Sequence, residues 1–243
     1  TASGVGFTKT VGYTPPLDWF GVDRFEIEVG DGVLTDTIAV TVTVAPVNDA
    51  PVASPDTPAT AEDTALVISP LANDADVENT PLAASRLGSP AHGTATLSGT
   101  TQLVYTPTLD FNGTDVFTYT ASDGDLDDTA TITVTVAPVE DAPTIVEGAG
   151  IAVTMSEDGS PTPFALALHA TDPDAGDTLT WSVLTQALTG TATASGVGFT
   201  QTLDYTPPLD WFGVDRFEIE VGDGVLTDTI AVSVTVAPVN DAP

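Results

Sequence analysis

The residues best suited to chemistry in this chain are closely spaced acidic side chains in short turns. Asp172, Asp174 and Asp177 stand in Thr-Asp-Pro-Asp-Ala-Gly-Asp, and Asp74 and Asp76 stand in Asn-Asp-Ala-Asp. In an Asp-x-Asp turn alternate residues share a side, so both carboxylates face one point. Calcium takes about six to eight hard oxygen ligands in irregular geometry, whereas magnesium needs a tighter octahedron and transition metals favour nitrogen or sulfur. These turns therefore indicate calcium, although aspartate is also common in turns that hold no metal.

A proline-flanked segment recurs in register with these turns. It has the sequence Pro-Val-Asn-Asp-Ala-Pro at 46–51 and 238–243, and Pro-Val-Glu-Asp-Ala-Pro at 138–143. Proline restricts the backbone, and each copy carries two oxygen-bearing side chains. We interpret each copy as a stiff junction between domains that also contributes to a cation site. Acidic pairs at Glu62-Asp63 and Glu157-Asp158 recur with the same register.

Internal repetition defines the elements that must position these residues. Residues 1–51 and 193–243 differ only at Lys9/Gln201, Val11/Leu203, Gly12/Asp204 and Thr41/Ser233. A diverged relative occupies 105–143, and the junctions indicate modules of roughly 90 to 100 residues. Apolar residues alternate with polar ones through 25–29, 38–44, 117–121 and 132–136, which predicts strands with one buried face.

The fold predicted from this pattern is all-β, with tandem seven-stranded Greek-key β-sandwiches of the cadherin or immunoglobulin type. The predicted modules are residues 1–51, the C-terminal half of a repeat, and the complete repeats 52–143 and 144–243. In 52–143 we expect strands near 56–61, 64–69, 82–89, 93–98, 101–106, 114–122 and 127–137, and no helix. Residues 1–51 lack the early strands. We therefore expect either completion by a neighbouring chain or a window from a longer array.

Composition limits the classes of partner. The chain of 243 residues has 35 Asp and Glu against 4 Lys and Arg, a formal charge of −31. Nucleic acid is excluded because a polyanion needs a basic surface, and docking on anionic lipid is disfavoured. No apolar run is long enough to insert in a membrane, and the absence of cysteine rules out disulfides and thiolate metal sites.

Several motifs resemble those of the cadherins. Residues 170–177 resemble the cadherin Asp-x-Asp calcium loop, 47–51 a shortened inter-domain linker, and 121–124 the Ala-x-Asp-Gly motif. Leu109-Asp110 resembles the start of Leu-Asp-Arg-Glu, but Phe111-Asn112 stands where Arg-Glu is expected. The whole chain is most similar to the bacterial cadherin-like tandem repeat of giant surface proteins and adhesins, which ends in Asn-Asp-Ala-Pro. The absence of Arg-Glu after Leu109-Asp110 and the short linker imply fewer ions per junction than in animal cadherins.

The resemblance implies Ca2+ held between successive domains by ligands from both and from the linker. At the junction ending in residue 143 these would be Glu62, Asp110, Glu140, Asp141, Asp172, Asp174 and Asp223. At the junction ending in residue 51 they would be Asp18, Asn48, Asp49, Asp74, Asp76 and Asp123. The last junction would use Glu157, Asp210, Asn240 and Asp241.

The function expected from this resemblance is a non-enzymatic, calcium-rigidified stalk segment of a large bacterial surface adhesin or secreted repeat protein. Its partners would be neighbouring repeats of the same or identical chains. A surface glycan or receptor would be reached through regions outside this segment. One alternative is a self-assembling extracellular fibre or surface lattice. Another is a carbohydrate-binding module that uses the loop aromatics Phe20 or Phe212.

Overall fold

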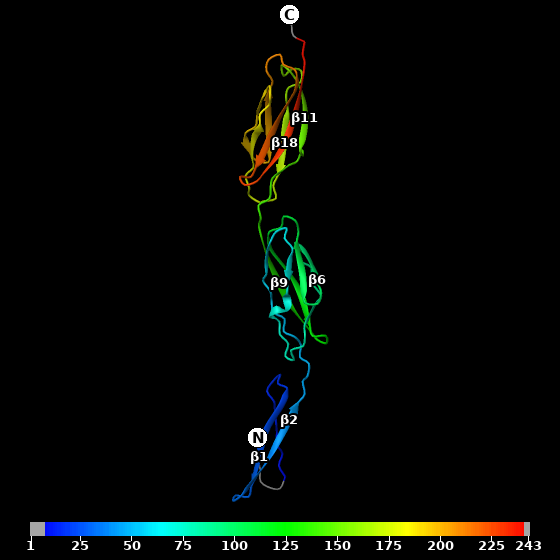
Figure 1. The fold of residues 1–243 in the computed structure, drawn as a ribbon, viewed down its shortest axis with the longest axis vertical. Helices are drawn as coiled ribbons and strands as arrows, with labels where there is room; N and C mark the ends of the chain where they lie inside the picture. Colours follow the sequence, from blue (N-terminus) through cyan, green and yellow to red (C-terminus); the bar gives the residue numbers. More distant parts are fainter. Residues whose placement is uncertain (1–7, 241–243) are drawn as a thin grey trace. The chain divides into compact units, whose positions relative to one another are not determined.

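A computed structural model describes residues 8–240, which form strands joined by short turns (Figure 1). Contacts divide the chain into two compact units, Thr1–Pro138 and Val139–Pro243, and each is described by itself. The division falls inside the proline-flanked segment 138–143. Strands make up 52% of the structure and helix 2%, so the all-β prediction is confirmed.

The first complete module is a sandwich of two mainly antiparallel sheets. One sheet has the order β3-β9-β8-β5 and the other β4-β7-β6, in which β3 alone pairs in parallel, with β9. Leu103, Tyr105, Tyr119, Ile132 and Val134 are fully buried between them. The seven strands are β3 (Ala59–Ala61), β4 (Leu66–Ile68), β5 (Ala83–Ser85), β6 (Gly93–Ser98), β7 (Gln102–Pro107), β8 (Gly113–Ser122) and β9 (Asp127–Ala137).

One short helix differs from the sequence-based expectation. Pro70–Asn73 forms the 3-10 helix η1, with proline in its first turn, directly after β4. Proline suits this position because the amide at the start of a helix has no intrahelical partner. β3 and β4 are also shorter than the predicted strands, and only an isolated bridge between Asp56 and Ile132 continues the pairing before β3.

The second complete module repeats this plan with nine strand segments. Its sheets have the orders β11-β18-β17-β13-β15 and β10-β12-β16-β14. The two extra segments are the two-residue strands β10 and β15. The segments are β10 (Thr144–Ile145), β11 (Gly150–Ser156), β12 (Leu166–Thr171), β13 (Thr180–Thr185), β14 (Thr191–Thr193), β15 (Gly196–Val197), β16 (Thr200–Thr206), β17 (Gly213–Gly222) and β18 (Thr227–Ala237).

The first half-module is a two-stranded hairpin. β1 (Gly21–Gly30) pairs antiparallel with β2 (Thr35–Val44) along their full length. Its sequence is nearly that of β17 and β18, but its apolar residues are not buried. Ile38 is 65% exposed, whereas Ile230 at the equivalent position is fully buried. Apolar side chains that are buried in β17 and β18 are therefore exposed or half-exposed in β1 and β2.

Candidate metal centre

Five carboxylates of the second unit gather where strands β12 and β17 end. We call Glu140, Asp172, Asp174, Asp177 and Asp223 the acidic cluster. Oxygen atoms of Glu140, Asp174 and Asp177 lie within 4.8 Å of one another, and so do those of Asp172, Asp177 and Asp223. Asp177 belongs to both groups. The arrangement offers only carboxylate oxygens, which are the ligands that hard cations prefer.

The loop after β12 sets the direction of two of these side chains. Asp172 Oδ1 accepts the backbone N–H of Asp174 at 2.9 Å, which closes an aspartate turn. Asp174 Oδ2 in turn accepts the backbone N–H of Asp141 at 2.8 Å. The loop is therefore hydrogen-bonded to the proline-flanked segment, which places Glu140 beside it.

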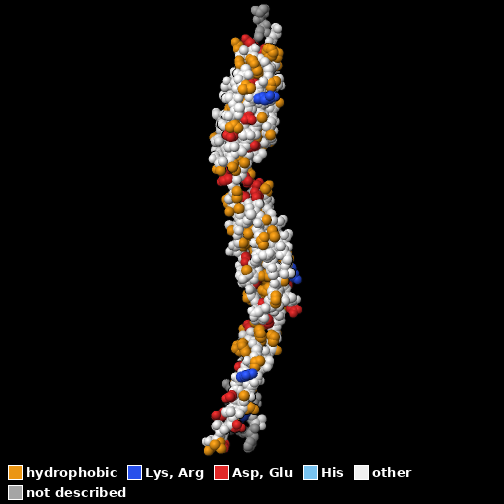
Figure 2. All heavy atoms as spheres, viewed as in Figure 1, with side chains coloured by type: hydrophobic (Ala, Val, Ile, Leu, Met, Phe, Trp, Pro, Cys, Tyr) orange, Lys and Arg blue, Asp and Glu red, His pale blue; other side chains and the backbone are white. Residues whose placement is uncertain are grey.

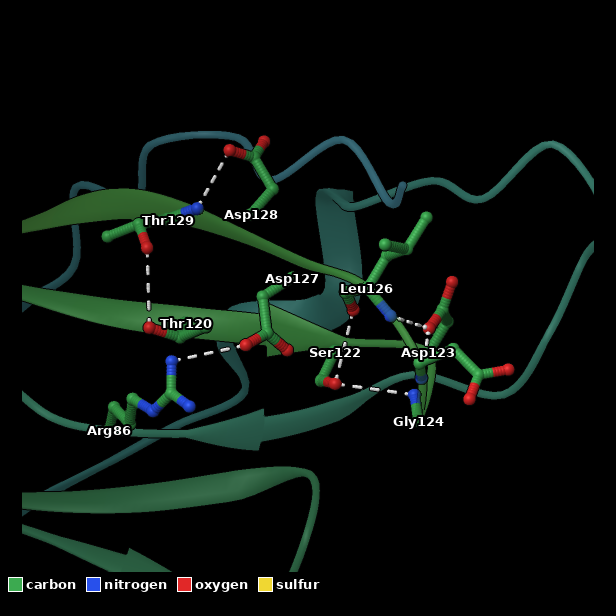
Figure 3. A network of polar contacts seen from close by, with 10 residues as sticks. Arg86, Thr120, Ser122, Asp123, Gly124, Leu126, Asp127, Asp128 and Thr129 are labelled. Carbon is green, nitrogen blue, oxygen red and sulfur yellow. Dashed lines mark hydrogen bonds and ion pairs between the residues drawn. The ribbon is translucent and has the colours of Figure 1, made fainter. Parts of the chain in front are cut away.

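The turn between β17 and β18 fixes Asp223. Asp223 Oδ1 accepts the backbone N–H groups of Val225 at 2.6 Å and Leu226 at 2.8 Å. These hydrogen bonds hold the pKa of Asp223 below its usual value, so the side chain stays charged. The same turn occurs at Asp123 in the first module, where the carboxylate accepts the amide of Leu126 (Figure 3). The Asp-Gly turn thus uses one carboxylate oxygen and leaves the other for a further partner.

Two oxygens of the acidic cluster have no hydrogen-bond partner in the part of the chain that the structure describes. Asp172 Oδ2 and Asp223 Oδ2 are buried and accept no hydrogen bond from the described residues. A buried carboxylate oxygen without a partner is costly, because it has lost its hydration without a replacement. These two atoms fit a cation bound between the β12 loop and the β17–β18 turn.

The electrostatics of the cluster also favour a cation. The pKa of Glu140 is raised by burial and then by the nearby carboxylates of Asp174, Asp177, Asp223 and Asp172. Burial and the same neighbours raise the pKa of Asp177. Arg216 is the only Lys or Arg between residues 139 and 243. The negative charges therefore repel one another with almost no basic side chain available to offset them.

The first complete module has acidic residues at positions equivalent to the acidic cluster, but they stand at a different place in its Asp-x-Asp motif. Val52 pairs with Ala75 as Thr144 pairs with Thr171, so Asp76 corresponds to Asp172 and Glu78 to Asp174. The contacts agree, because Glu78 Oε2 accepts the backbone N–H of Asp49 at 3.2 Å, as Asp174 accepts that of Asp141. Asp76 Oδ2 is buried and has no hydrogen-bond partner among residues 8–240, and Asn48 donates to Asp123 Oδ2 at 2.8 Å. Asn48 is thus tied to Asp123 and Asp49 to Glu78, but among the described residues no group of three carboxylates within 4.8 Å of one another includes Asp49, Asp76 or Asp123.

Asp74, which the sequence motif groups with Asp76, is used differently. Its carboxylate accepts the Tyr119 hydroxyl at 2.8 Å and the backbone N–H of Ser54 at 2.8 Å. These contacts turn Asp74 toward the sandwich and away from Asp76. Sequence reasoning missed Glu78, and it placed Asp177 in the calcium-type turn but left it out of the ligand set. The third aspartate of the 171–177 turn was the available signal for Asp177, whereas only the strand register identifies Glu78.

The remaining predicted ligands of the first unit lie on turns that begin or end strands. Asn112 donates to Glu62 Oε2 at 3.5 Å, and Asp110 donates its backbone N–H to Asp63 Oδ1 at 3.2 Å. Asp110 has a φ of 56°, as does Asp18 in the half-module, and Asp210 has 54°. The three residues therefore share one left-handed turn, a conformation that aspartate tolerates better than most residues.

The predicted ligands of the last junction belong to the other end of the second unit. Asp210 precedes the ten-residue strand β17 and Asp223 follows it, so they lie at opposite ends of that strand. Glu157 Oε1 accepts the backbone N–H of Val239 at 2.6 Å. Val239 precedes Asn240 in the sequence, so this contact places Glu157 close to Asn240. Asp241 lies outside the described residues.

The loop aromatics divide into a packed and an exposed residue. Trp211 packs against the core of the second module, as Phe111 does in the first. Phe212 is 60% exposed and Phe20 is 38% exposed. In each complete module the first aromatic of the loop therefore packs against the core, and in the second module the next residue, Phe212, is the exposed one.

The surface of the chain, its fold and the comparisons with known proteins together indicate its family. Figure 2 shows acidic side chains scattered over the visible face and few basic ones. In residues 8–240 no helix has the length and apolarity to cross a membrane. Paired sheets repeated along the chain define tandem immunoglobulin-like β-sandwiches. The bacterial Ig domain family matches residues 48–136 and 140–235, and the chain belongs to this family.

Solved structures similar to the chain include enzymes and cadherins. An endo-fucoidan hydrolase of glycoside hydrolase family 107 is 20% identical over 99% of this chain and 39% of that chain, with a TM-score of 0.35. Protocadherin gamma B7 extracellular domains 1–4 are 17% identical over 90% and 59%, with a TM-score of 0.49. Human protocadherin-24 domains 1–2 are 15% identical over 78% and 100%, with a TM-score of 0.47. The chain spans about two-fifths of the hydrolase chains that it matches. No curated protein sequence matches it.

Proposed function

We propose that this chain is a calcium-stiffened stalk segment of a large bacterial surface or secreted protein, and that it has no enzymatic activity. The observation that carries the proposal is the acidic cluster with its two buried, unpartnered oxygens at Asp172 and Asp223. A second contact supports it, because Asp174 is hydrogen-bonded to the proline-flanked segment through Asp141. A cation at the cluster would therefore act on the segment that connects successive modules.

The chemistry of the donors favours Ca2+ over other metals. The cluster consists of carboxylates from a loop, a turn and the proline-flanked segment, without histidine or cysteine. Zinc and copper would require nitrogen or sulfur ligands, and magnesium would require near-octahedral geometry. Calcium accepts the irregular set, and water molecules can complete its coordination.

The stiffening follows from charge and chain entropy. Without a cation the carboxylates of Glu140, Asp177 and Asp223 repel one another, so the segment at Glu140 is pushed from the loop. With a cation these three parts of the chain are cross-linked. The prolines already restrict the segment, so little further conformational entropy is lost. By the cadherin resemblance, Glu62 and Asp110 of the preceding module would complete the set.

Calorimetric titration of metal-free chain with Ca2+ tests the site. Asp177→Asn removes the charge shared by both ligand groups with almost no change in shape. We expect it to weaken binding at this site by at least about tenfold, which corresponds to about 1.4 kcal/mol. Asp204→Asn is the control, because this exposed aspartate of β16 lies outside the cluster. Equal affinities of the two variants, or no calcium binding by the parent chain, would contradict the proposal.

The proposed setting is the cell exterior. Bacterial Ig domains are typical of extracellular repeat proteins, and the acidic surface suits a medium with free calcium. The partners would be adjoining repeats, with glycan or receptor binding left to other parts of the protein. The fibre and carbohydrate-binding alternatives stay predictions. The exposed Phe212 is the residue on which the second depends, so loss of glycan binding in Phe212→Ala would be its support.

A further inference from the structure

The turn that leads into β8 of the first complete module ends with Asn112, and Gly113 begins the strand. This is the only asparagine in the chain that is followed by glycine. An asparagine side chain can react with the backbone nitrogen of the next residue, and glycine favours this reaction because it has no Cβ to block the approach. The other four asparagines precede aspartate or threonine, whose side chains hinder it.

The fold requires glycine at this position. Gly113 has a φ of 132°, and the equivalent Gly21 and Gly213 have values of 137° and 148°, a region that residues with a side chain rarely adopt. The residue before the glycine varies, since it is phenylalanine in the other two copies. Asn112 therefore creates the reactive pair in one copy alone, at a position where the glycine is fixed by the backbone.

The side chain of Asn112 is accessible and only weakly held. Asn112 is exposed, and its side-chain amide donates to Glu62 Oε2 at 3.5 Å. A hydrogen bond of this length is at the limit of the usual range and restrains a side chain little. The side-chain amides of Asn48 and Asn73 make shorter hydrogen bonds, of 2.8 and 3.1 Å. Asn112 is therefore freer to turn toward the main chain than these two residues are.

The attacking nitrogen lies at the end of a strand. Gly113 is the first residue of β8, and its pairing with Val136 is the terminal pair of the β8–β9 ladder. The end of a ladder opens at a lower free energy than the centre of a sheet. The Gly113 nitrogen can therefore be released without unfolding the module.

We propose that Asn112 is a site of spontaneous deamidation. The Gly113 nitrogen loses its proton to base and bonds to the side-chain carbonyl carbon of Asn112. The bond from this carbon to Nδ2 breaks, ammonia leaves with a proton from the solvent, and a cyclic imide forms. Water then opens the imide to aspartate or to isoaspartate, in which the main chain runs through the side-chain carbon. The net change consumes water, releases ammonia and needs no oxidant or other reagent.

The reaction alters a contact with a buried acidic residue. Glu62 is 2% exposed, and its backbone N–H donates to the Ala137 carbonyl oxygen at 2.9 Å. A carboxylate in place of the Asn112 amide has no N–H to donate and brings a second negative charge beside Glu62. A donor and acceptor pair thus becomes a pair of like charges, which repel. Deamidation should therefore loosen the end of the module where β9 passes into the proline-flanked segment.

The first test follows deamidation in the folded chain 1–243 at mildly alkaline pH in chelator, by mass spectrometry of peptic peptides. We expect Asn112 to react at least about tenfold faster than Asn48 or Asn73. Asn112→Gln is the matched control, because its longer side chain would have to close a larger ring and should stay unreacted. Equal rates at the three asparagines, or reaction of Asn112 only after the chain is unfolded in urea, would overturn the proposal.

Amide hydrogen exchange in chelator measures the consequence for the module. In Asn112→Asp, exchange in β8 and β9 should be faster than in the parent by about threefold or more, whereas Asn112→Gln should stay within about twofold. Deamidated parent chain, separated by its added negative charge on an ion exchanger, should behave like Asn112→Asp. Unchanged exchange in both would overturn the proposed effect on the module. Neither test depends on calcium, because chelator is present throughout.

Discussion

The carboxylate of Asp174 accepts a hydrogen bond from the backbone N–H of Asp141 at 2.8 Å. Glu78 makes the same contact with Asp49 at 3.2 Å in the first module, although the two loops differ in length and sequence. In both modules an acidic residue of the loop is thereby tied to the proline-flanked segment. The loop and the proline-flanked segment are therefore held together by a hydrogen bond in each module.

Asp177→Asn should have opposite effects on the stability of the second unit in the absence and in the presence of calcium. In chelator the variant removes repulsion from Asp172, Asp174 and Asp223, so the second unit should melt at a higher temperature than the parent. In saturating calcium it lacks a ligand and should melt at a lower temperature. Calorimetric melting of both proteins in both buffers measures this crossover. The calcium account does not survive if Asp177→Asn shifts the melting temperature in the same direction in both buffers.

The metal-free second unit should become more stable on mild acidification. Glu140 and Asp177 have raised pKa values in the folded state, owing to burial and to neighbouring carboxylates. The stability from these groups is present below their unfolded pKa values and is lost as pH rises through the folded ones. The hydrogen-bonded Asp223 has a lowered pKa, so its contribution is lost only in stronger acid. Melting temperature in chelator should therefore pass through a maximum below neutral pH.

The double variant Glu140→Gln, Asp177→Asn is the matched control for this pH dependence. It cannot gain the two protons, so its melting temperature should not rise between neutral and mildly acidic pH. A rise equal to that of the parent would assign the effect to other groups.

Asp215→Ala should be among the most damaging substitutions in the second unit. It leaves three backbone N–H groups and the Tyr205 hydroxyl without their acceptor, at a cost of about 3 kcal/mol or more of unfolding free energy. Asp23→Ala changes the same position in an almost identical sequence; it removes the matching bond from the Tyr13 hydroxyl but no loop amide contact among residues 8–240. It should alter the unfolding free energy of the chain by less than about 0.5 kcal/mol, as measured by urea denaturation. Equal effects would show that the loop contacts contribute little.

Asp56 should titrate well above an ordinary aspartate. Burial, and then the negative charge of Asp74, raises its pKa to about 6, and its Oδ2 atom has no hydrogen-bond partner among the described residues. Carboxyl carbon NMR of the chain should show this midpoint. Its contribution to stability is lost as pH rises through the folded pKa, so Asp56→Asn should raise the melting temperature at neutral pH. A midpoint near the usual value for aspartate, about 4, would contradict this assignment.

The strands could be predicted because their periodicity is local. Alternation in Phe117, Tyr119 and Ala121 places one face in the core whatever the partner strand is, and β8 and β9 match their predicted bounds within one residue. Short strands such as β3 and β4 were overestimated. Pro58 has no backbone N–H to donate, so the pairing before β3 is reduced to the isolated bridge at Asp56. The 3-10 helix Pro70–Asn73 has too few residues for any periodicity to appear in the sequence.

The sequence motifs identified which acidic turns to consider for the candidate site. They did not identify which residues of the two modules occupy equivalent positions. Asp172, Asp174 and Asp223 could be predicted from their motifs, because these motifs follow recognisable strands. Glu78 could not be found from the sequence, since its match to Asp174 depends on the pairing of Val52 with Ala75. Asp74 illustrates the opposite problem. It fits the Asp-x-Asp pattern, yet the Tyr119 hydroxyl in the core directs its carboxylate elsewhere.

The central claim is that a cation bound by the acidic cluster stiffens the chain at its proline-flanked segments. Small-angle X-ray scattering of residues 1–243 in calcium and in chelator tests it most directly. The account predicts a larger maximum dimension and radius of gyration in calcium, and a smaller difference for Asp177→Asn. Scattering profiles of the parent chain that superimpose in the two buffers would contradict it.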